Sequence, residues 1–149
     1  MRTALYAGSF DPFTNGHLDI LEQACQIFDK VIVAVAYNSE KKVFLPIEKR
    51  LEIIRKSTAD IKNVEVDSYE GLTTEYAKMH GIHFLVRGVR NTADFEYEHQ
   101  ILDTNSILAP QIKTILLTPK PENSFISSTI VREIYKNGGD ISTLVPYVW

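Results

Sequence analysis

The sequence predicts a single domain of the α/β class, with a five-stranded, mainly parallel sheet and helices on both faces. Apolar runs of strand length alternate with amphipathic stretches of helical length, an order typical of βαβ units. The chain has 149 residues, of which 44% are hydrophobic, so one domain can bury a substantial core. No linker or low-complexity tract divides it. Such a sheet has right-handed crossovers and binds its ligands at the carboxyl ends of the strands.

The first half of the chain follows this alternation closely. Residues 3–7 and 31–36 are apolar and predict strands, with a helix over about 16–28 between them. Pro46 is expected to open a second helix, since proline is tolerated in a first helical turn. A short strand at 64–66 follows. The basic residues of the second helix are expected on its outer face: Lys49, Arg50 and Arg55.

The second half repeats the pattern. Thr73 or Thr74 can cap a helix that ends near Gly81. The remaining expected elements are a strand at 83–86, a helix at about 93–108, a strand at 112–117, and a helix that begins at Ser127 or Ser128 and stops at 137–139.

The most informative segment is GSFDPFTNGH, residues 8–17, directly behind the first strand. A strand that feeds a helix through a glycine turn leaves unpaired amide N–H groups at the helix start, and these favour a bound phosphate. Gly16 leaves room for a ligand near the backbone, and His17 adds a side-chain donor. The spacing differs from the dinucleotide fingerprint and from the phosphate loop ending in Gly-Lys-Ser/Thr, which disfavours hydride transfer and ordinary NTPase chemistry.

Composition excludes several other classes. Sixteen basic and 19 acidic residues give a net charge of −3, which argues against a nucleic-acid binder with a broad basic face. Anionic ligands would instead need a local cluster, which Lys41, Lys42, Arg87 and Arg90 could supply at the strand ends. No apolar run approaches a membrane span, so we expect no membrane partner and a cytoplasmic protein. Cys25 is the only cysteine and is expected to be a core residue.

Three ordered motifs resemble one family. Residues 14–17 match the T/H-x-G-H signature of the nucleotidylyltransferase superfamily, and the longer GSFDPFTNGH string resembles the start of bacterial phosphopantetheine adenylyltransferases. Residues 87–98 resemble that family's RGxRxxxDFEYE block, and residues 124–129 resemble its SFISSS/T block. The resemblance extends over essentially the whole chain and implies a Rossmann-like domain.

The resemblance implies a reaction and its partners. ATP and 4′-phosphopantetheine would give dephospho-coenzyme A and pyrophosphate, with Mg²⁺ held through the ATP phosphates and no dedicated protein metal site. Family members are similar in forming homohexamers. The phosphate nucleophile is already an anion near neutral pH, because its second pKa is about 6, so no general base is required. Catalysis then rests on positioning and charge neutralisation, with His17 as the transition-state donor.

Residue by residue, the resemblance assigns two groups of binding positions. The ATP side comprises Ser9, Phe10, His17, Gly88, Val89, Arg90, Glu98, Asn123, Ser124, Phe125, Ile126, Ser127, Ser128 and Thr129. The phosphopantetheine side comprises Ser9, Lys41, Thr73 and Arg87. Several have plain structural alternatives: Phe10 as a core aromatic, Thr73 as a helix cap, and the consecutive hydroxyls of residues 127–129 as caps.

Two other functions remain open at this point. The T-x-G-H motif and the ISSTxxR pattern of residues 126–132 also resemble nicotinamide mononucleotide adenylyltransferases, whereas the block at 87–98 favours phosphopantetheine. From a different class, the chain could be a nucleotide-binding module without turnover. An acceptor assay distinguishes these functions.

Overall fold

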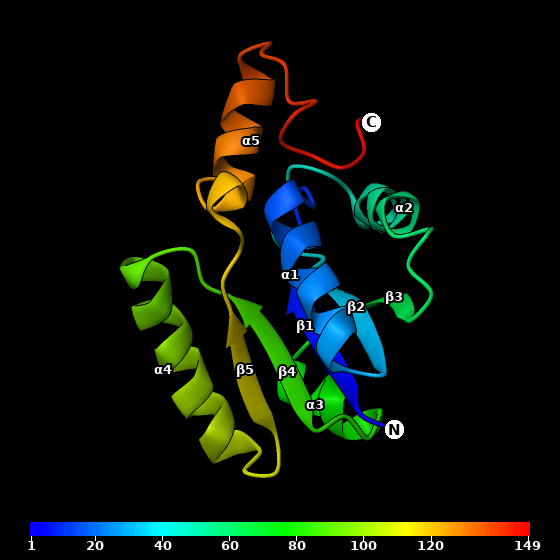
Figure 1. Cartoon of the computed structure of the whole chain (residues 1–149), viewed down its shortest axis with the longest axis vertical. Helices are drawn as coiled ribbons and strands as arrows, with labels where there is room; N and C mark the ends of the chain where they lie inside the picture. The colour runs from blue at the N-terminus through cyan, green and yellow to red at the C-terminus, as the bar shows by residue number, and fades with distance from the viewer.

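The computed structural model describes residues 1–149 as one sheet with helices on both faces (Figure 1). Its elements are β1 (Thr3–Gly8), α1 (Asn15–Ile27), β2 (Lys30–Ala36), α2 (Ile47–Ser57), β3 (Val64–Tyr69), α3 (Thr73–Met79), β4 (Phe84–Gly88), α4 (Thr92–Leu108), β5 (Lys113–Leu117), a 3₁₀ turn η1 (Pro121–Asn123) and α5 (Ser128–Lys136). The predicted α/β class and five strands are therefore confirmed.

The strand order creates a crevice at one edge of the sheet. The strands run β3-β2-β1-β4-β5, and all four neighbouring pairs are parallel. The chain therefore builds outward from β1 to β3, then returns to β1's other side to place β4 and β5. The crossovers diverge between β1 and β4, where an open parallel sheet leaves room for a ligand beyond the strand ends.

Two apolar clusters cover the two faces of the sheet. The larger joins α1 and α2 to the sheet and includes the fully buried Phe13, Leu21 and Ile53. The smaller lies under α3 and includes Tyr76 and Ile82. The inward faces of these helices are thus satisfied by apolar burial, the main favourable term in folding.

A third cluster holds α5 and the C-terminal segment beyond the carboxyl ends of the strands (Figure 1). Val131 of α5 packs with Ile141, Leu144 and Val145. The amide of Asn15, the first residue of α1, donates to the Leu144 carbonyl at 2.9 Å. The end of the chain is thereby fastened to the helix start that carries His17.

Several expected bounds differ from the structure. β3 continues to Tyr69 because it pairs with β2 as far as Ala36. β4 includes Arg87 and Gly88 because its ladder with β5 runs that far. Leu72, without a side-chain hydrogen bond, occupies the N-cap of α3, so the prediction that Thr73 or Thr74 caps this helix is wrong. The smaller shifts concern the first residues of α1, α2, α4 and β5.

One expected surface residue lies inside. Arg50 of α2 is only 3% exposed, because its guanidinium reaches across to the turn behind β1. The prediction of an outer-face role for this residue is therefore wrong. None of the helices is both long and apolar enough to cross a membrane.

Candidate active site

A cleft of about 340 Å³ opens at the carboxyl ends of β1 and β4. Its walls come from the β1–α1 turn, the start of α1, the beginning of α4 and the start of α5. The sequence-predicted residues that line it are Ser9, Phe10, His17, Arg87, Gly88, Arg90, Glu98, Ile126, Ser127, Ser128 and Thr129. Segments from both ends of the chain therefore meet at the topological switch point.

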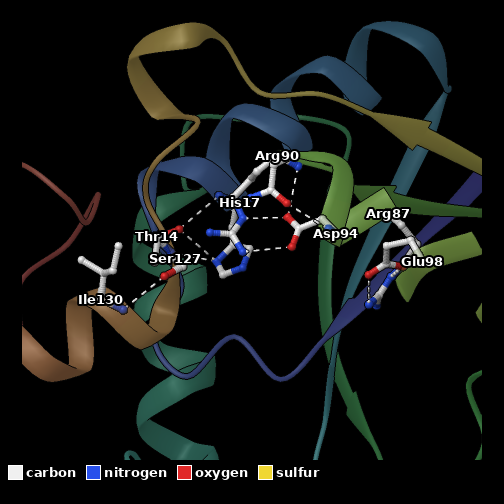
Figure 2. A network of polar contacts seen from close by, with 9 residues as sticks. Thr14, His17, Arg87, Arg90, Asp94, Glu98, Ser127 and Ile130 are labelled. Atoms are coloured by element: carbon white, nitrogen blue, oxygen red, sulfur yellow. Dashed lines mark hydrogen bonds and ion pairs between the residues drawn. The ribbon is translucent and has the colours of Figure 1, made fainter. Parts of the chain in front are cut away.

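His17 is oriented by a capping box at the start of α1 (Figure 2). Thr14 is the N-cap, and the amide of His17 donates to its hydroxyl at 3.3 Å. In return, the Thr14 amide donates to Nδ1 of His17 at 3.0 Å. Because a backbone amide can only donate, Nδ1 must be unprotonated, and the neutral ring carries its proton on Nε2. His17 therefore offers one defined N–H donor.

Aromatic rings fix the His17 imidazole and keep it neutral. Phe13 stacks on it with ring centroids 5.6 Å apart, and Phe10 meets it edge-on at 5.0 Å. Burial, with smaller contributions from the charges of Arg90 and Arg87, lowers the pKa of His17 from 6.5 to about 3. Near neutral pH this residue is a neutral hydrogen-bond donor and carries no charge.

The turn behind β1 has its carbonyl groups held by side chains. Arg50 donates to the Ser9 carbonyl at 3.0 Å, and Arg132 donates to the Asp11 carbonyl at 2.8 Å. Ser128 donates to the Pro12 carbonyl at 2.8 Å. Because three carbonyl oxygens of the turn are directed at these donors, its N–H groups are left as the groups that can bind an anion.

Phe10 shapes this turn through an unusual backbone conformation. Its φ of +46° lies in the left-handed region, which costs a non-glycine residue free energy and persists only where the surroundings enforce it. The amides of Ser9 and Phe10 have no partner within the chain, and both residues line the cleft. The Phe10 side chain is also buried in the apolar core. Phe10 can therefore be a core aromatic and still present its backbone amide to the cleft.

The helix start offers fewer amides than the sequence suggests. The Asn15 amide is taken by Leu144 and the His17 amide by Thr14. A Cβ at Gly16 would lie 3.4 Å from the Ile126 carbonyl oxygen, which is ordinary van der Waals contact. Gly16 also lines the cleft, so the expectation that it leaves room for a ligand near the backbone stays a prediction.

Two arginines reach the cleft from β4 and the turn after it, and each is paired with α4 (Figure 2). Arg87 forms a two-pronged ion pair with Glu98 at 2.7 and 2.8 Å and donates to the Ala7 carbonyl at 2.8 Å. Arg90 pairs with Asp94 at 2.9 Å. Glu98 was predicted on the ATP side, and the structure shows that it holds Arg87. The Arg87–Glu98 pair attaches α4 to β4, whereas the Arg90–Asp94 pair is local to the start of α4.

Arg132 is a cleft cation that the sequence argument left unassigned. It lines the cleft and bonds to the Asp11 carbonyl and the Thr129 hydroxyl, and no carboxylate pairs with it. A signal existed: the ISSTxxR pattern places an arginine one helical turn after the Ser128–Thr129 hydroxyls, on the same face of α5. An unpaired guanidinium suits the recognition of a phosphate.

The segment before α5 divides into two parts. Ser127 is the N-cap of α5 and accepts from the Ile130 amide, as one of the two expected cap assignments requires (Figure 2). Residues 126–129 line the cleft, whereas Asn123, Ser124 and Phe125 do not. Val89 is buried in the body of the domain. Gly88 packs against Ile20, since a Cβ there would meet its side chain at 3.0 Å.

Lys41 lies in a second hollow of about 510 Å³, which shares Ser9 with the first. Arg87 is in the first cleft, so the structure does not bring these two predicted phosphate ligands into one hollow. The carboxylate of Asp11, a residue that lines the first cleft, accepts hydrogen bonds from the Phe44 and Leu45 amides, each at 2.8 Å. Thr73 lies two residues after Gly71, which lines the second hollow. The hydroxyl groups of Thr73 and Tyr69 form a hydrogen bond.

Comparisons with known proteins agree with the fold. The family model described as cytidylyltransferase-like matches residues 5–134. A solved bifunctional NMN adenylyltransferase/ADP ribose pyrophosphatase from Francisella tularensis superposes with a TM-score of 0.74 at 15% identity, over 98% of this chain and 45% of that one. A structure from Vibrio parahaemolyticus gives a TM-score of 0.72 at 19% identity over 97% of this chain. The chain thus belongs to the cytidylyltransferase-like family and shares its fold with these two structures.

Relatives of higher sequence identity identify the enzyme family. The phosphopantetheine adenylyltransferase of Nautilia profundicola is 48% identical over 143 residues, which are 96% of this chain and 93% of that protein. The phosphopantetheine adenylyltransferase of Crocosphaera subtropica is 50% identical over 143 residues, 96% of this chain and 91% of the relative. This chain belongs to the phosphopantetheine adenylyltransferase family, as its three motifs predicted.

Proposed function

We propose that this protein transfers the adenylyl group of ATP to 4′-phosphopantetheine, giving dephospho-coenzyme A and pyrophosphate in coenzyme A biosynthesis. The observation that carries the proposal is the neutral His17 ring, held with its Nε2–H free in a cleft that also contains unpaired amides and the unpaired Arg132. Relatives at 48–50% identity carry the same activity in their names.

The reaction is a direct displacement at the α-phosphorus. An oxygen of the phosphopantetheine phosphate attacks that atom while the bond to the oxygen bridging to the β-phosphate breaks, and pyrophosphate leaves with the electron pair. The nucleophile is an anion near pH 7, since its second pKa is about 6. No proton has to be removed, and no protein nucleophile takes part. The configuration at phosphorus is therefore inverted.

The chain's own residues contribute positioning and charge. We place the α-phosphate oxygens at the Nε2–H of His17, because a fixed donor that faces developing negative charge stabilises the transition state without reorganisation. The amides of Ser9 and Phe10 and the guanidinium of Arg132 are the further phosphate contacts. Lys41, in the adjoining hollow, holds the acceptor side.

We propose that Mg²⁺ enters with the nucleotide. The three carboxylates that line the cleft are committed elsewhere: Asp11 to two amides, Asp94 to Arg90 and Glu98 to Arg87. This donor set fits an ion that keeps its waters and takes phosphate oxygens as ligands. When bound there, the ion would neutralise charge on the departing pyrophosphate.

The test is an acceptor assay. Purified protein with ATP and Mg²⁺ should release pyrophosphate on addition of 4′-phosphopantetheine and give no comparable rate with nicotinamide mononucleotide. A preference for the mononucleotide would reassign the acceptor. Tight ATP binding without pyrophosphate from either acceptor would make the chain a non-catalytic nucleotide-binding module.

We further propose a homohexamer. The observation that supports assembly is α4, where four large apolar residues are exposed by 45–81%: Phe95, Tyr97, Ile107 and Leu108. Several exposed large apolar side chains on one helix are typical of a surface that a partner covers. The sixfold number comes from the resemblance. Light scattering should give a mass near six times 16.9 kDa, and a persistent monomer at micromolar concentration would contradict assembly.

A further inference from the structure

Asp19 is a buried carboxylate on α1, two residues after His17. It is 7% exposed and does not border the cleft. Its Oδ2 accepts from the Lys120 amide at 2.7 Å and from Nδ2 of Asn123 at 3.0 Å. Its Oδ1 accepts from Nε2 of Gln23 at 2.9 Å, and that same nitrogen lies 2.9 Å from the Thr118 carbonyl. Every contact leads directly or through Gln23 to residues 118–123.

No cation pairs with this carboxylate. Burial by itself would raise the pKa of Asp19, but the hydrogen bonds from Asn123, Gln23 and the Lys120 amide outweigh burial and hold the pKa below its usual value. A buried charge is costly unless it is well hydrogen-bonded. The reaction described above does not use Asp19, so its charge has another purpose.

The segment that Asp19 holds leads into the cleft. Residues 118–123 connect β5 to residues 126–129, and Pro119 itself lines the cleft. Asn123 and Ile126 lie against Gly16, because a Cβ on that glycine would come within 3.6 and 3.4 Å of their carbonyl oxygens. The segment is thus seated on α1, within one turn of His17, and Asp19 is its polar attachment.

We propose that Asp19 is a positioning residue for ATP: it fixes the 118–123 segment to α1, so that residues 126–129 and the His17 ring face the same phosphate chain. The identity of ATP rests on the proposed function. Asn123, which was predicted to contact ATP, acts from behind the segment through Asp19. The proposal concerns the ATP side only, because none of residues 118–123 lines the second hollow that contains Lys41.

The experiment is a double-mutant cycle read out as ATP binding. Calorimetric Kd values for ATP with Mg²⁺ are measured for wild type, Asp19→Asn, Asn123→Ala and the double variant, with Asp60→Asn as the exposed control. Asp19→Asn should weaken ATP about tenfold, the scale of a hydrogen bond to a charged group, and leave 4′-phosphopantetheine within about twofold. The double variant should match Asp19→Asn alone, since Asn123 acts through the same carboxylate.

The outcomes separate this proposal from the function. Equal weakening of both substrates, unchanged ATP affinity in folded Asp19→Asn, or multiplying losses in the double variant would each overturn it. If Asp19→Asn fails to fold by circular dichroism, Asn123→Ala decides, and it must weaken ATP selectively. Wild type that binds ATP but does not turn over phosphopantetheine would refute the acceptor and leave the cycle valid. Wild type that binds no ATP would refute both.

Discussion

Helices α1 and α4 both border the cleft, but they are held in the molecule in opposite ways. α1 buries five of its 13 residues, packs against the sheet through Leu21, and has its first turn closed by Thr14 and by the C-terminal segment. α4 buries one of its 17 residues, and that residue is the charged Glu98. Its links to the body of the domain include the Arg87–Glu98 ion pair, and its first turn is paired locally through Arg90 and Asp94.

The comparison distinguishes a cleft wall that is packed within this chain, α1, from one whose apolar residues remain exposed, α4. The catalytic donor stands on the element with satisfied polar groups and apolar packing, where a ring can be held to a fraction of an ångström. Helix α4, which has the exposed apolar residues, also carries the carboxylates that pair with the cleft arginines. A partner that covers α4 would therefore also influence the positions of Arg87 and Arg90.

The largest expected effect is the loss of the His17 donor. His17→Ala should lower kcat at least ~10²-fold, the scale for removing one transition-state hydrogen bond. His17→Gln is the matched control for the helix start, because glutamine at this position can accept from the Thr14 amide in a capping box. It should retain the thermal stability of wild type and lose activity. Near-normal kcat in either folded variant would remove His17 from the mechanism.

The second effect concerns the attachment of α4. Glu98→Ala leaves the guanidinium of Arg87 without its carboxylate, and breaking a largely buried pair costs about 3 kcal/mol of unfolding free energy. Glu96→Ala, on the exposed side of the same helix, should change stability by less than about 0.5 kcal/mol. Urea denaturation of both variants measures the difference. Equal small losses would show that α4 is held by other contacts.

The third effect separates the two hollows. Lys41→Ala should weaken 4′-phosphopantetheine about tenfold with little change for ATP, because Lys41 lies outside the first cleft. Arg90→Ala should weaken ATP more than the acceptor, because Arg90 lines that cleft. Titration of each ligand into each variant provides the measurement. The same loss for both ligands in both variants would reject the division.

The smallest effect concerns exposed apolar residues on the two helices. Ile107 on α4 is 81% exposed and Ile27 on α1 is 53% exposed. Ile107→Glu should lower the mass observed by light scattering, since a charge in an apolar interface is unfavourable. Ile27→Glu should leave the mass unchanged. An unchanged mass for Ile107→Glu would place this residue outside any interface.

The sequence was sufficient for the parts of the fold that depend on local periodicity. Alternating apolar runs predicted each strand, and the N-cap of α5 is Ser127, one of the two expected residues. Arg50 was misjudged because its burial depends on where α2 lands against the Ser9 carbonyl, which no local pattern records. The unavailability of the Asn15 amide arises in the same way from a contact with Leu144, near the other end of the chain.

In the candidate site, too, local motifs could be predicted and tertiary contacts could not. The T-x-G-H motif identified His17 and its helix start, but the proton position follows only from the Thr14 amide that donates to Nδ1. A capping box with histidine in the place of glutamate is a pattern that could have signalled this contact. Glu98 was assigned to the ATP side because the block at 87–98 was interpreted by resemblance, and its pairing with Arg87 is a tertiary contact.

The low pKa of His17 has a consequence for stability. The folded value of about 3 lies below the unfolded value of 6.5, so between these values the unfolded chain binds a proton that the folded chain does not. Folding stability should therefore fall as pH falls through this window, by up to about 1.4 kcal/mol per pH unit from this residue. Above pH 6.5 the His17 contribution is constant.

The central claim is that His17 works as a neutral donor from Nε2, and nitrogen-15 spectra of histidine-labelled protein test it most directly. Variant His17→Gln identifies the resonances of His17 among those of the four histidines. Between pH 5 and 8 we expect an unprotonated Nδ1, a protonated Nε2 and no titration, because the pKa of His17 is lowered to about 3. Formation of an imidazolium with a pKa near 6.5, or a proton on Nδ1, would contradict the account.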